Sequence, residues 1–183
     1  MNGFQIATIL NNIPVTKLLF QGIYTYDNVP KFLPNKNSIY VINTLSQYDS
    51  HDMGHWVVIV IKNNVLFFLD SMGNKPNFYG FNISNCFESF PRRKVVVFSR
   101  RVQNEFSLVC GAYVIVFAYI MCKYGKISFI KSKFGRNTCR NDIVVLKFLY
   151  KLIGFNNRCN DFLCSRTTFN RKCEKDCLCS SHN

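Results

Sequence analysis

Residues 108–122 read LVCGAYVIVFAYIMC and form the longest apolar run of the chain. The run is apolar on every face of a helix, which is typical of a helix that passes through a protein core. A bilayer span needs about 20 residues, so we expect a buried helix and no association with a membrane. Cys110 lies at the start of this helix, where the positive end of the helix dipole favours a thiolate.

Two strand-like segments precede the apolar run. Residues 56–61 and 65–69 are β-branched or aromatic, and the segment Lys62-Asn63-Asn64 between them indicates a tight hairpin. His55 precedes the first strand and Asp70 follows the second, so the hairpin should bring their side chains together at its open end. Asp70 can then accept a hydrogen bond from one imidazole nitrogen and fix the tautomer of the ring. The alternative is that both residues merely cap loops at the strand ends.

The other predicted elements lie on both sides of these segments. No strand–helix–strand unit repeats, so their order predicts an α+β fold. We expect one domain over residues 1–155 and a Cys-rich, basic C-terminal tail over residues 156–183. The remaining elements are expected as a helix at 4–13, a loop at 22–37, a strand at 38–43, a turn-rich segment at 71–82, a helix at 84–90 capped by Ser84, a strand at 95–98 and a helix at 141–153.

The composition restricts the classes of function. Of the 183 residues, 48% are hydrophobic and 18% are charged, which excludes disorder along the whole chain. The formal net charge of +13 predicts a polyanionic partner, with nucleic acid first and an anionic membrane surface or an acidic peptide as alternatives. The N-terminal residues lack the basic start and apolar core of a signal peptide, so we expect a protein that is kept inside a cell and not secreted.

Gln103 lies seven residues before Cys110, on a loop that precedes the apolar helix. From there its side-chain N–H and the backbone N–H of Cys110 can together form an oxyanion hole. Gly111 keeps the first turn of the helix thin, so a substrate backbone can approach. Taken singly, a buried helix cysteine and a solvated loop glutamine are both ordinary. Together with His55 and Asp70, however, they supply a nucleophile, an oxyanion donor, a base and a group that orients the base.

With these residues in this order, the chain resembles the adenovirus-type cysteine endopeptidases (adenain) and, more distantly, the SUMO- and ubiquitin-like-protein proteases. The resemblance covers roughly residues 4–155, and the His-Trp pair and the seven-residue step from Gln to Cys are its most specific parts. The segments that carry it are the opening helix, residues 22–27, residues 42–44, His55-Trp56, residues 68–73, Val102-Gln103 and Cys110-Gly111.

The resemblance implies an enzyme with a papain-like cysteine protease fold, in which a central helix carries the nucleophile and packs on a mixed sheet. It implies a thiol endopeptidase that cleaves viral capsid or core precursor proteins during virion maturation. In this family Cys110 would be the nucleophile, His55 the base, Asp70 its orienter and Gln103 the oxyanion donor. Adenoviral members often carry a glutamate at the position of Asp70, but the related ubiquitin-like-protein proteases use aspartate. We therefore expect a monomer that works in the virion and in the host nucleus or cytoplasm.

Adenain also uses DNA and a short activating peptide, which is joined to the enzyme by a disulfide. Cys86 is the only cysteine in the corresponding interval, and Arg92 lies nearer the family's position, so we do not expect that disulfide. The chemistry needs no cofactor, but DNA and an activating peptide stay open as activators. The basic residues, including those at 123–140, are consistent with DNA binding without sequence preference. The alternative is that their charge only keeps the protein soluble. The candidate DNA contacts are Arg92, Arg93, Lys94, Arg100 and Arg101.

Other motifs and residues in the chain allow other interpretations. His51 and His55 flank an acid as in a zinc protease motif, but Gly54 and the strand after it argue against the helix that this motif needs, so we expect no metal in the active site. An isopeptidase that removes ubiquitin-like modifiers, and a basic virion structural protein with an inactive protease fold, both stay open as functions. The spacing of the cysteines in the tail is only a weak signal for a zinc site, and disulfides or free thiols are the alternatives. These cysteines are Cys159, Cys164, Cys173, Cys177 and Cys179.

Overall fold

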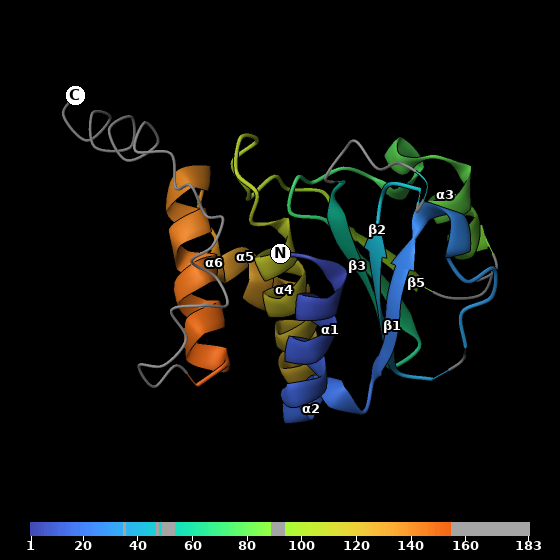
Figure 1. Ribbon diagram of the computed structural model, residues 1–183, viewed down its shortest axis with the longest axis horizontal. Helices are drawn as coiled ribbons and strands as arrows, with labels where there is room; N and C mark the ends of the chain where they lie inside the picture. Colours follow the sequence, from blue (N-terminus) through green and yellow to red (C-terminus); the bar gives the residue numbers. More distant parts are fainter. Residues whose placement is uncertain (35, 47, 49–53, 89–93, 155–183) are drawn as a thin grey trace.

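A five-stranded mixed sheet lies at the centre of the protein (Figure 1). The computed structural model describes residues 1–34, 36–46, 48, 54–88 and 94–154. The strands lie side by side in chain order, as β1 Phe20–Thr25, β2 Ser38–Asn43, β3 Trp56–Lys62, β4 Val65–Leu69 and β5 Lys94–Phe98. The two outer pairs, β1 with β2 and β4 with β5, are parallel, and the inner pairs are antiparallel.

The hairpin predicted from the sequence is confirmed as β3 and β4. Asn63 and Asn64 at its tip have φ angles of 50° and 62°, which suit a two-residue turn whose twist matches that of the strands. The strands pair from Lys62 opposite Val65 outward. As a result, the residue before β3 and the residue after β4 leave the hairpin at the same end of the sheet.

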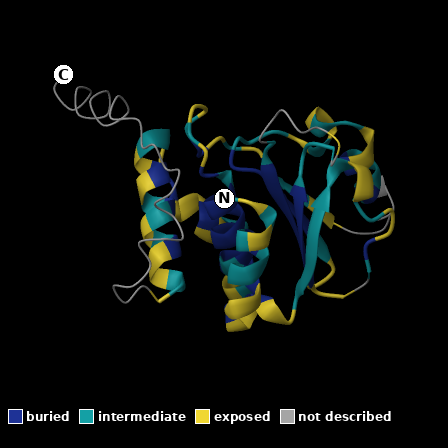
Figure 2. Ribbon diagram, viewed as in Figure 1, coloured by how far each residue is buried: buried dark blue, intermediate teal, exposed yellow. Residues whose placement is uncertain are grey.

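Helices cover both faces of the sheet (Figure 1). On one face α4 packs against β3, and α1, α2, α5 and α6 pack around α4. On the other face α3 closes a second, smaller core. Figure 2 shows the buried residues gathered on α4 and on the inner strands. The helices are α1 Gly3–Asn12, α2 Pro14–Lys17, α3 Phe81–Glu88, α4 Cys110–Tyr124, α5 Ile127–Lys133 and α6 Thr138–Leu152, with short 3-10 turns η1 Tyr26–Asn28 and η2 Pro76–Tyr79.

The predicted core helix corresponds to α4, which begins at Cys110. Lys62 donates from its Nζ to the carbonyl oxygens of Met121, at 3.1 Å, and Cys122, so these two carbonyl groups near the C-terminal end of α4 have a partner. Gly125 ends the helix with a left-handed φ of 65°. Among the helices of the described residues, none combines the length and the apolar character that crossing a bilayer requires.

The structure agrees with the α+β class and differs from the sequence prediction in four segments, one of which is helix α2, which was not predicted. The loop predicted at 22–37 is wrong at its start, because residues up to Thr25 belong to β1, an edge strand that is half-buried along its whole length. Ser84 is not a cap: it lies inside α3, which begins at Phe81, and its hydroxyl donates to the carbonyl oxygen of Gly80 at 3.2 Å. Helix α5 was not predicted. The predicted tail lies outside the described residues.

Candidate active site

Each of the four candidate residues lies at the end of an element or on a loop. His55 directly precedes β3 and Asp70 directly follows β4. Cys110 is the first residue of α4, and Gln103 lies on the loop that joins β5 to α4. Because β3, β4 and α4 pack against one another, these positions can meet without any irregular excursion of the chain.

The predicted pairing of His55 with Asp70 is confirmed. The His55 Nε2 atom lies 2.6 Å from Asp70 Oδ1, and the Asp70 side chain is fully buried while that of His55 is 18% exposed. The backbone N–H groups of Met72 and Asn74 donate to the two carboxylate oxygens, each at 2.8 Å. The Tyr79 hydroxyl donates to Oδ2, also at 2.8 Å. Four donors thus fix the orientation of the carboxylate, which in turn fixes the His55 ring.

His55 is also hydrogen-bonded to Cys110. Since Nε2 faces Asp70, Nδ1 is the ring nitrogen that remains for the sulfur. Burial lowers the pKa of His55, but hydrogen bonds to Asp70 and Cys110 and the charges of both groups outweigh burial and raise the pKa to about 9. The three side chains therefore form one hydrogen-bonded row in which the imidazole favours its protonated form.

The Cys110 thiol has the opposite shift. Burial raises its pKa, but the hydrogen bond and charge of His55 and a hydrogen bond from the backbone of Trp56 outweigh burial, so the pKa lies below that of an ordinary cysteine. A lowered thiol pKa beside a raised imidazole pKa favours a thiolate–imidazolium pair, the nucleophilic form of cysteine. At Cys122, near the other end of α4, burial outweighs the charge of Lys62 and raises the pKa to about 11.

Gln103 is buried, and both ends of its amide are held. The Ser71 hydroxyl donates to Gln103 Oε1 at 2.6 Å, and Gln103 Nε2 donates to the carbonyl oxygen of Ser107 at 2.8 Å. A carbonyl oxygen can only accept, so the amide nitrogen must face Ser107. The second N–H of Nε2 has no acceptor among the described residues. The amide therefore has a fixed orientation and keeps one N–H free to donate.

Tyr79 is a site residue that the sequence analysis missed. Its ring stacks on that of His55, with centroids 6.0 Å apart and planes 20° apart. Asn74 Nδ2 donates to its hydroxyl at 3.0 Å, and the hydroxyl donates onward to Asp70. Burial, followed by the charge of Asp70, raises the pKa of Tyr79 far above its usual value, so the hydroxyl keeps its proton. No sequence signal marked Tyr79, which follows Asp70 within a turn-rich segment.

The residues next to His55 hold its backbone. Thr44 Oγ1 accepts from the His55 N–H at 3.2 Å, and the Thr44 N–H donates to the His55 carbonyl oxygen at 2.9 Å. Gly54 has a φ of 58°, and a Cβ atom there would lie 2.1 Å from Asn43 Oδ1. A side chain at this position would therefore be strained, which favours glycine. Trp56 packs in the main core, and its backbone contacts Cys110, so it serves both packing and the site.

The other candidate residues are not part of this row. Arg100 donates to the carbonyl oxygens of Lys131, at 3.1 Å, and Phe134, and Arg101 pairs with Glu105 at 2.6 Å. Lys94 is exposed on β5, whereas Arg92 and Arg93 lie outside the described residues. The five tail cysteines also lie outside them. No group of three or more metal-ligating side chains occurs within the described ranges.

Cys86 is the cysteine considered for a disulfide with an activating peptide. It is 1% exposed on the inner side of α3, and its thiol donates to the carbonyl oxygen of Ile83. Burial raises its pKa to about 12. A peptide thiol could reach Cys86 only if α3 moved away from the sheet, which agrees with the expectation that no such link forms.

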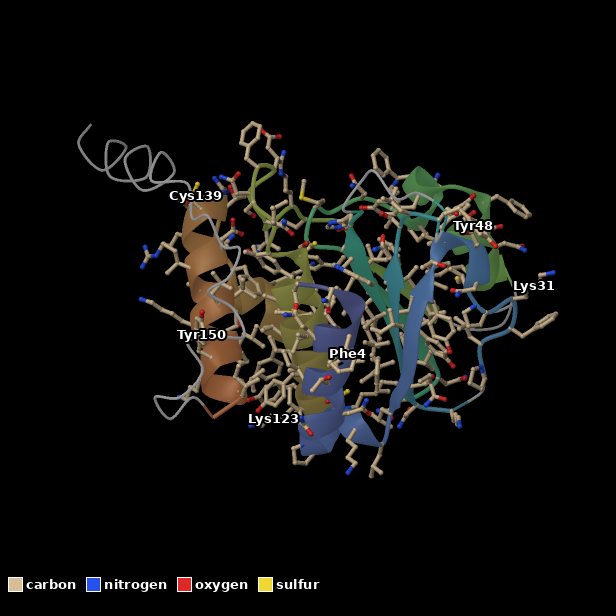
Figure 3. All side chains as sticks on the ribbon, viewed as in Figure 1. Phe4, Lys31, Tyr48, Lys123, Cys139 and Tyr150 are labelled. Atoms are coloured by element: carbon tan, nitrogen blue, oxygen red, sulfur yellow. The ribbon has the colours of Figure 1, made fainter. Side chains whose placement is uncertain are left out.

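Chemically, the row formed by Cys110, His55 and Asp70 contains the nucleophile and the base of acyl transfer through a thioester, and Gln103 is tied to it through Ser71, the residue that follows Asp70. Figure 3 shows the described side chains on the ribbon, with Phe4 of α1 and Cys139 of α6 labelled for orientation. A scan against protein-family models gives no match for this chain, and a search of curated proteins gives none either.

Proposed function

We propose that the protein is a cysteine endopeptidase with a papain-like fold, which cleaves precursor proteins of a DNA virus or a related mobile element during particle maturation. The observation that carries this proposal is the hydrogen-bonded row of Cys110, His55 and Asp70 at the start of α4. The viral substrate, and a place in the virion and in the host nucleus or cytoplasm, rest on the resemblance to adenain.

The mechanism follows from the row. The Cys110 thiolate attacks the carbonyl carbon of a peptide bond, and the carbonyl π electrons move onto oxygen. The spare N–H of Gln103 and the N–H of Cys110, which as the first residue of α4 has no intrahelical acceptor, donate to this oxyanion. The His55 imidazolium gives its proton to the leaving amine as the C–N bond breaks. Neutral His55 then takes a proton from water, whose oxygen attacks the thioester and releases Cys110.

The experiment is to incubate the protein with a library of proteome-derived peptides and to identify cleaved products by mass spectrometry. We expect Cys110→Ala to abolish every cleavage seen with the wild-type chain. Cys122→Ala, a change of the same kind on the same helix, should leave the cleavage pattern intact. Gln103→Ala should lower kcat about 100- to 1000-fold and KM little, because its donor acts mainly in the transition state. Cleavage by Cys110→Ala would refute the proposal.

Two other functions would give different results. An isopeptidase would cleave a ubiquitin-like modifier that carries a fluorophore on its C-terminal Gly-Gly, and it would release that fluorophore. It would leave the peptide library uncleaved. An inactive structural protein would show no reaction of Cys110 with a thiol-directed peptide warhead. We expect instead that the warhead labels Cys110 and that the library is cleaved, because the thiolate is favoured and the oxyanion donor is oriented.

We further propose that duplex DNA stimulates the enzyme. Residues 123–151 contain eight lysines and arginines and a single acid, Asp142, which is buried in α6. This segment, which covers the end of α4 together with α5 and α6, therefore exposes no negative side chain, which favours contact with phosphates over simple solubility. Peptide cleavage should rise with added duplex at low salt and return to its basal rate as salt increases. No stimulation at low salt would contradict this part of the proposal.

A further inference from the structure

The loop over residues 102–107, which carries Gln103, is fixed by hydrogen bonds from two helices. The carbonyl oxygen of Val102 accepts from the Tyr113 hydroxyl of α4 and from Asn141 Nδ2 of α6, each at 3.0 Å. On its other side, the N–H of Gln103 donates to the carbonyl oxygen of Ser71 at 3.0 Å. The position of the loop therefore depends on α6 as well as on the sheet.

A buried carboxylate lies at the centre of these contacts. Asp142 of α6 is 5% exposed, and its Oδ1 accepts from the Tyr113 hydroxyl at 2.9 Å and from the N–H of Asn104 at 3.4 Å. The Ser107 hydroxyl, which donates to the carbonyl oxygen of Asn104 at 3.0 Å, also lies close enough to Asp142 to lower the pKa of that carboxyl. All of these neighbouring groups are neutral. Burying a carboxylate among neutral groups is costly, so folding alone does not explain its presence.

The two loop residues that Asp142 contacts are the ones that position the Gln103 amide. Asn104 directly follows Gln103, and the Ser107 carbonyl oxygen accepts from Gln103 Nε2 at 2.8 Å. Asp142 thus holds the loop at the residue after Gln103 and at the residue that sets the direction of its amide. A shift of the loop by a fraction of an ångström would move the spare N–H away from the oxyanion.

We propose that Asp142 is a positioning residue for the oxyanion donor, which it holds through Asn104 and Ser107. This inference rests on the proposed function and extends its site to α6. Asp142 touches neither the nucleophile nor the base. Its loss should weaken stabilisation of the transition state while leaving the thiolate–imidazolium pair unchanged.

The variant Asp142→Asn keeps the size of the side chain and removes its charge. We expect kcat for a peptide substrate to fall roughly 10- to 100-fold with little change in KM, because a displacement of about 1 Å at a reacting centre costs up to about 100-fold. Alkylation of Cys110 by iodoacetamide should keep its wild-type rate at every pH. In that reaction an S–C bond forms, iodide leaves and no oxyanion develops, so it reports on the thiolate alone.

A double variant shows whether Asp142 acts through Gln103. If it does, Gln103→Ala combined with Asp142→Asn should be no slower than Gln103→Ala alone. Ser107→Ala removes one contact of Asp142 from a half-buried loop, so it provides a test that does not endanger the fold; kcat should fall a few-fold. The control is Ile143→Ala, an exposed neighbour on α6, which should behave as the wild type.

Three results would overturn the inference. One is wild-type kcat in both Asp142→Asn and Ser107→Ala. The second is an equal loss of kcat and of the alkylation rate, which indicates a general structural role. The third is a fully multiplicative loss in the double variant. A wild-type chain that cleaves no peptide would instead remove the proposed function, and this inference with it.

Discussion

Replacing Asp70 by Asn removes the negative charge next to His55 and keeps the size of the side chain. In the protein, burial lowers the His55 pKa, but Asp70 and Cys110 together raise it to about 9. The ordinary value is about 6.5, and a tenfold change in proton affinity is worth about 1.4 kcal/mol, so the imidazolium gains about 3 kcal/mol. If Asp70 supplies half of this gain, the variant lowers the His55 pKa by at least about one pH unit.

The direction of the effect on turnover follows from the roles of the two groups. Cleavage needs the Cys110 thiolate, which forms as pH rises through the lowered thiol pKa, and the His55 imidazolium, which is lost as pH rises through about 9. The variant therefore moves only the upper limb of the profile, to about pH 8. At pH 9 the protonated fraction falls from about one half to about one tenth, so kcat/KM should fall about fivefold more at pH 9 than at neutral pH.

The assay is kcat/KM for a cleaved peptide across the pH range, because this quantity reports the pKa values of the free enzyme. Glu105→Gln serves as the control: it removes the same charge from an exposed carboxylate that pairs with Arg101 and does not touch His55. Its upper limb should stay where the wild-type limb is. An unmoved upper limb in Asp70→Asn would refute the assignment of Asp70 to His55.

Three further variants test the supports of the site. Ser71→Ala leaves the buried Oε1 of Gln103 without a donor and should lower kcat about tenfold with little change in KM; an unchanged kcat would mean that the amide needs no such support. Tyr79→Phe removes one donor to the buried carboxylate and should lower the free energy of unfolding in urea by about 1–2 kcal/mol, and equal stability would count against that hydrogen bond. Gly54→Ala should lower the free energy of unfolding by about 1–3 kcal/mol, because φ is 58° and the new Cβ would lie 2.1 Å from a side-chain oxygen of β2. The control is Gly135→Ala, whose new Cβ would have no neighbour within 4 Å and which should keep its stability. Similar stabilities of the two variants would contradict the strain at Gly54.

The parts of the fold that could be predicted have strong local signals. The apolar run that begins at Leu108 predicts α4, and the Asn63-Asn64 pair between apolar segments predicts the hairpin. Edge strand β1 could not be predicted in the same way, because it is half-buried throughout and its sequence shows no alternation. Helix α5 is short and mixes lysine and serine with apolar residues, so its periodicity is weak.

For the site, the sequence indicated which residue types belong together but not what supports them. His55 and Asp70 could be paired because a hairpin joins them. Tyr79, Ser71 and Asp142 reach the site through loops and a helix whose positions depend on tertiary packing. Asp142 lies 38 residues from Asn104, its contact on the loop, and no local pattern links the two.

The central claim is that His55 keeps Cys110 as a thiolate in the folded protein. The most direct measurement is the ultraviolet absorbance of the thiolate during a pH titration, taken as the difference between the wild-type chain and Cys110→Ala, and repeated in a His55→Ala background. We expect a midpoint below that of a free cysteine in the wild type and a midpoint near the free value, about 8.5, once His55 is gone. The same midpoint in both backgrounds would contradict the pairing of sulfur and imidazole.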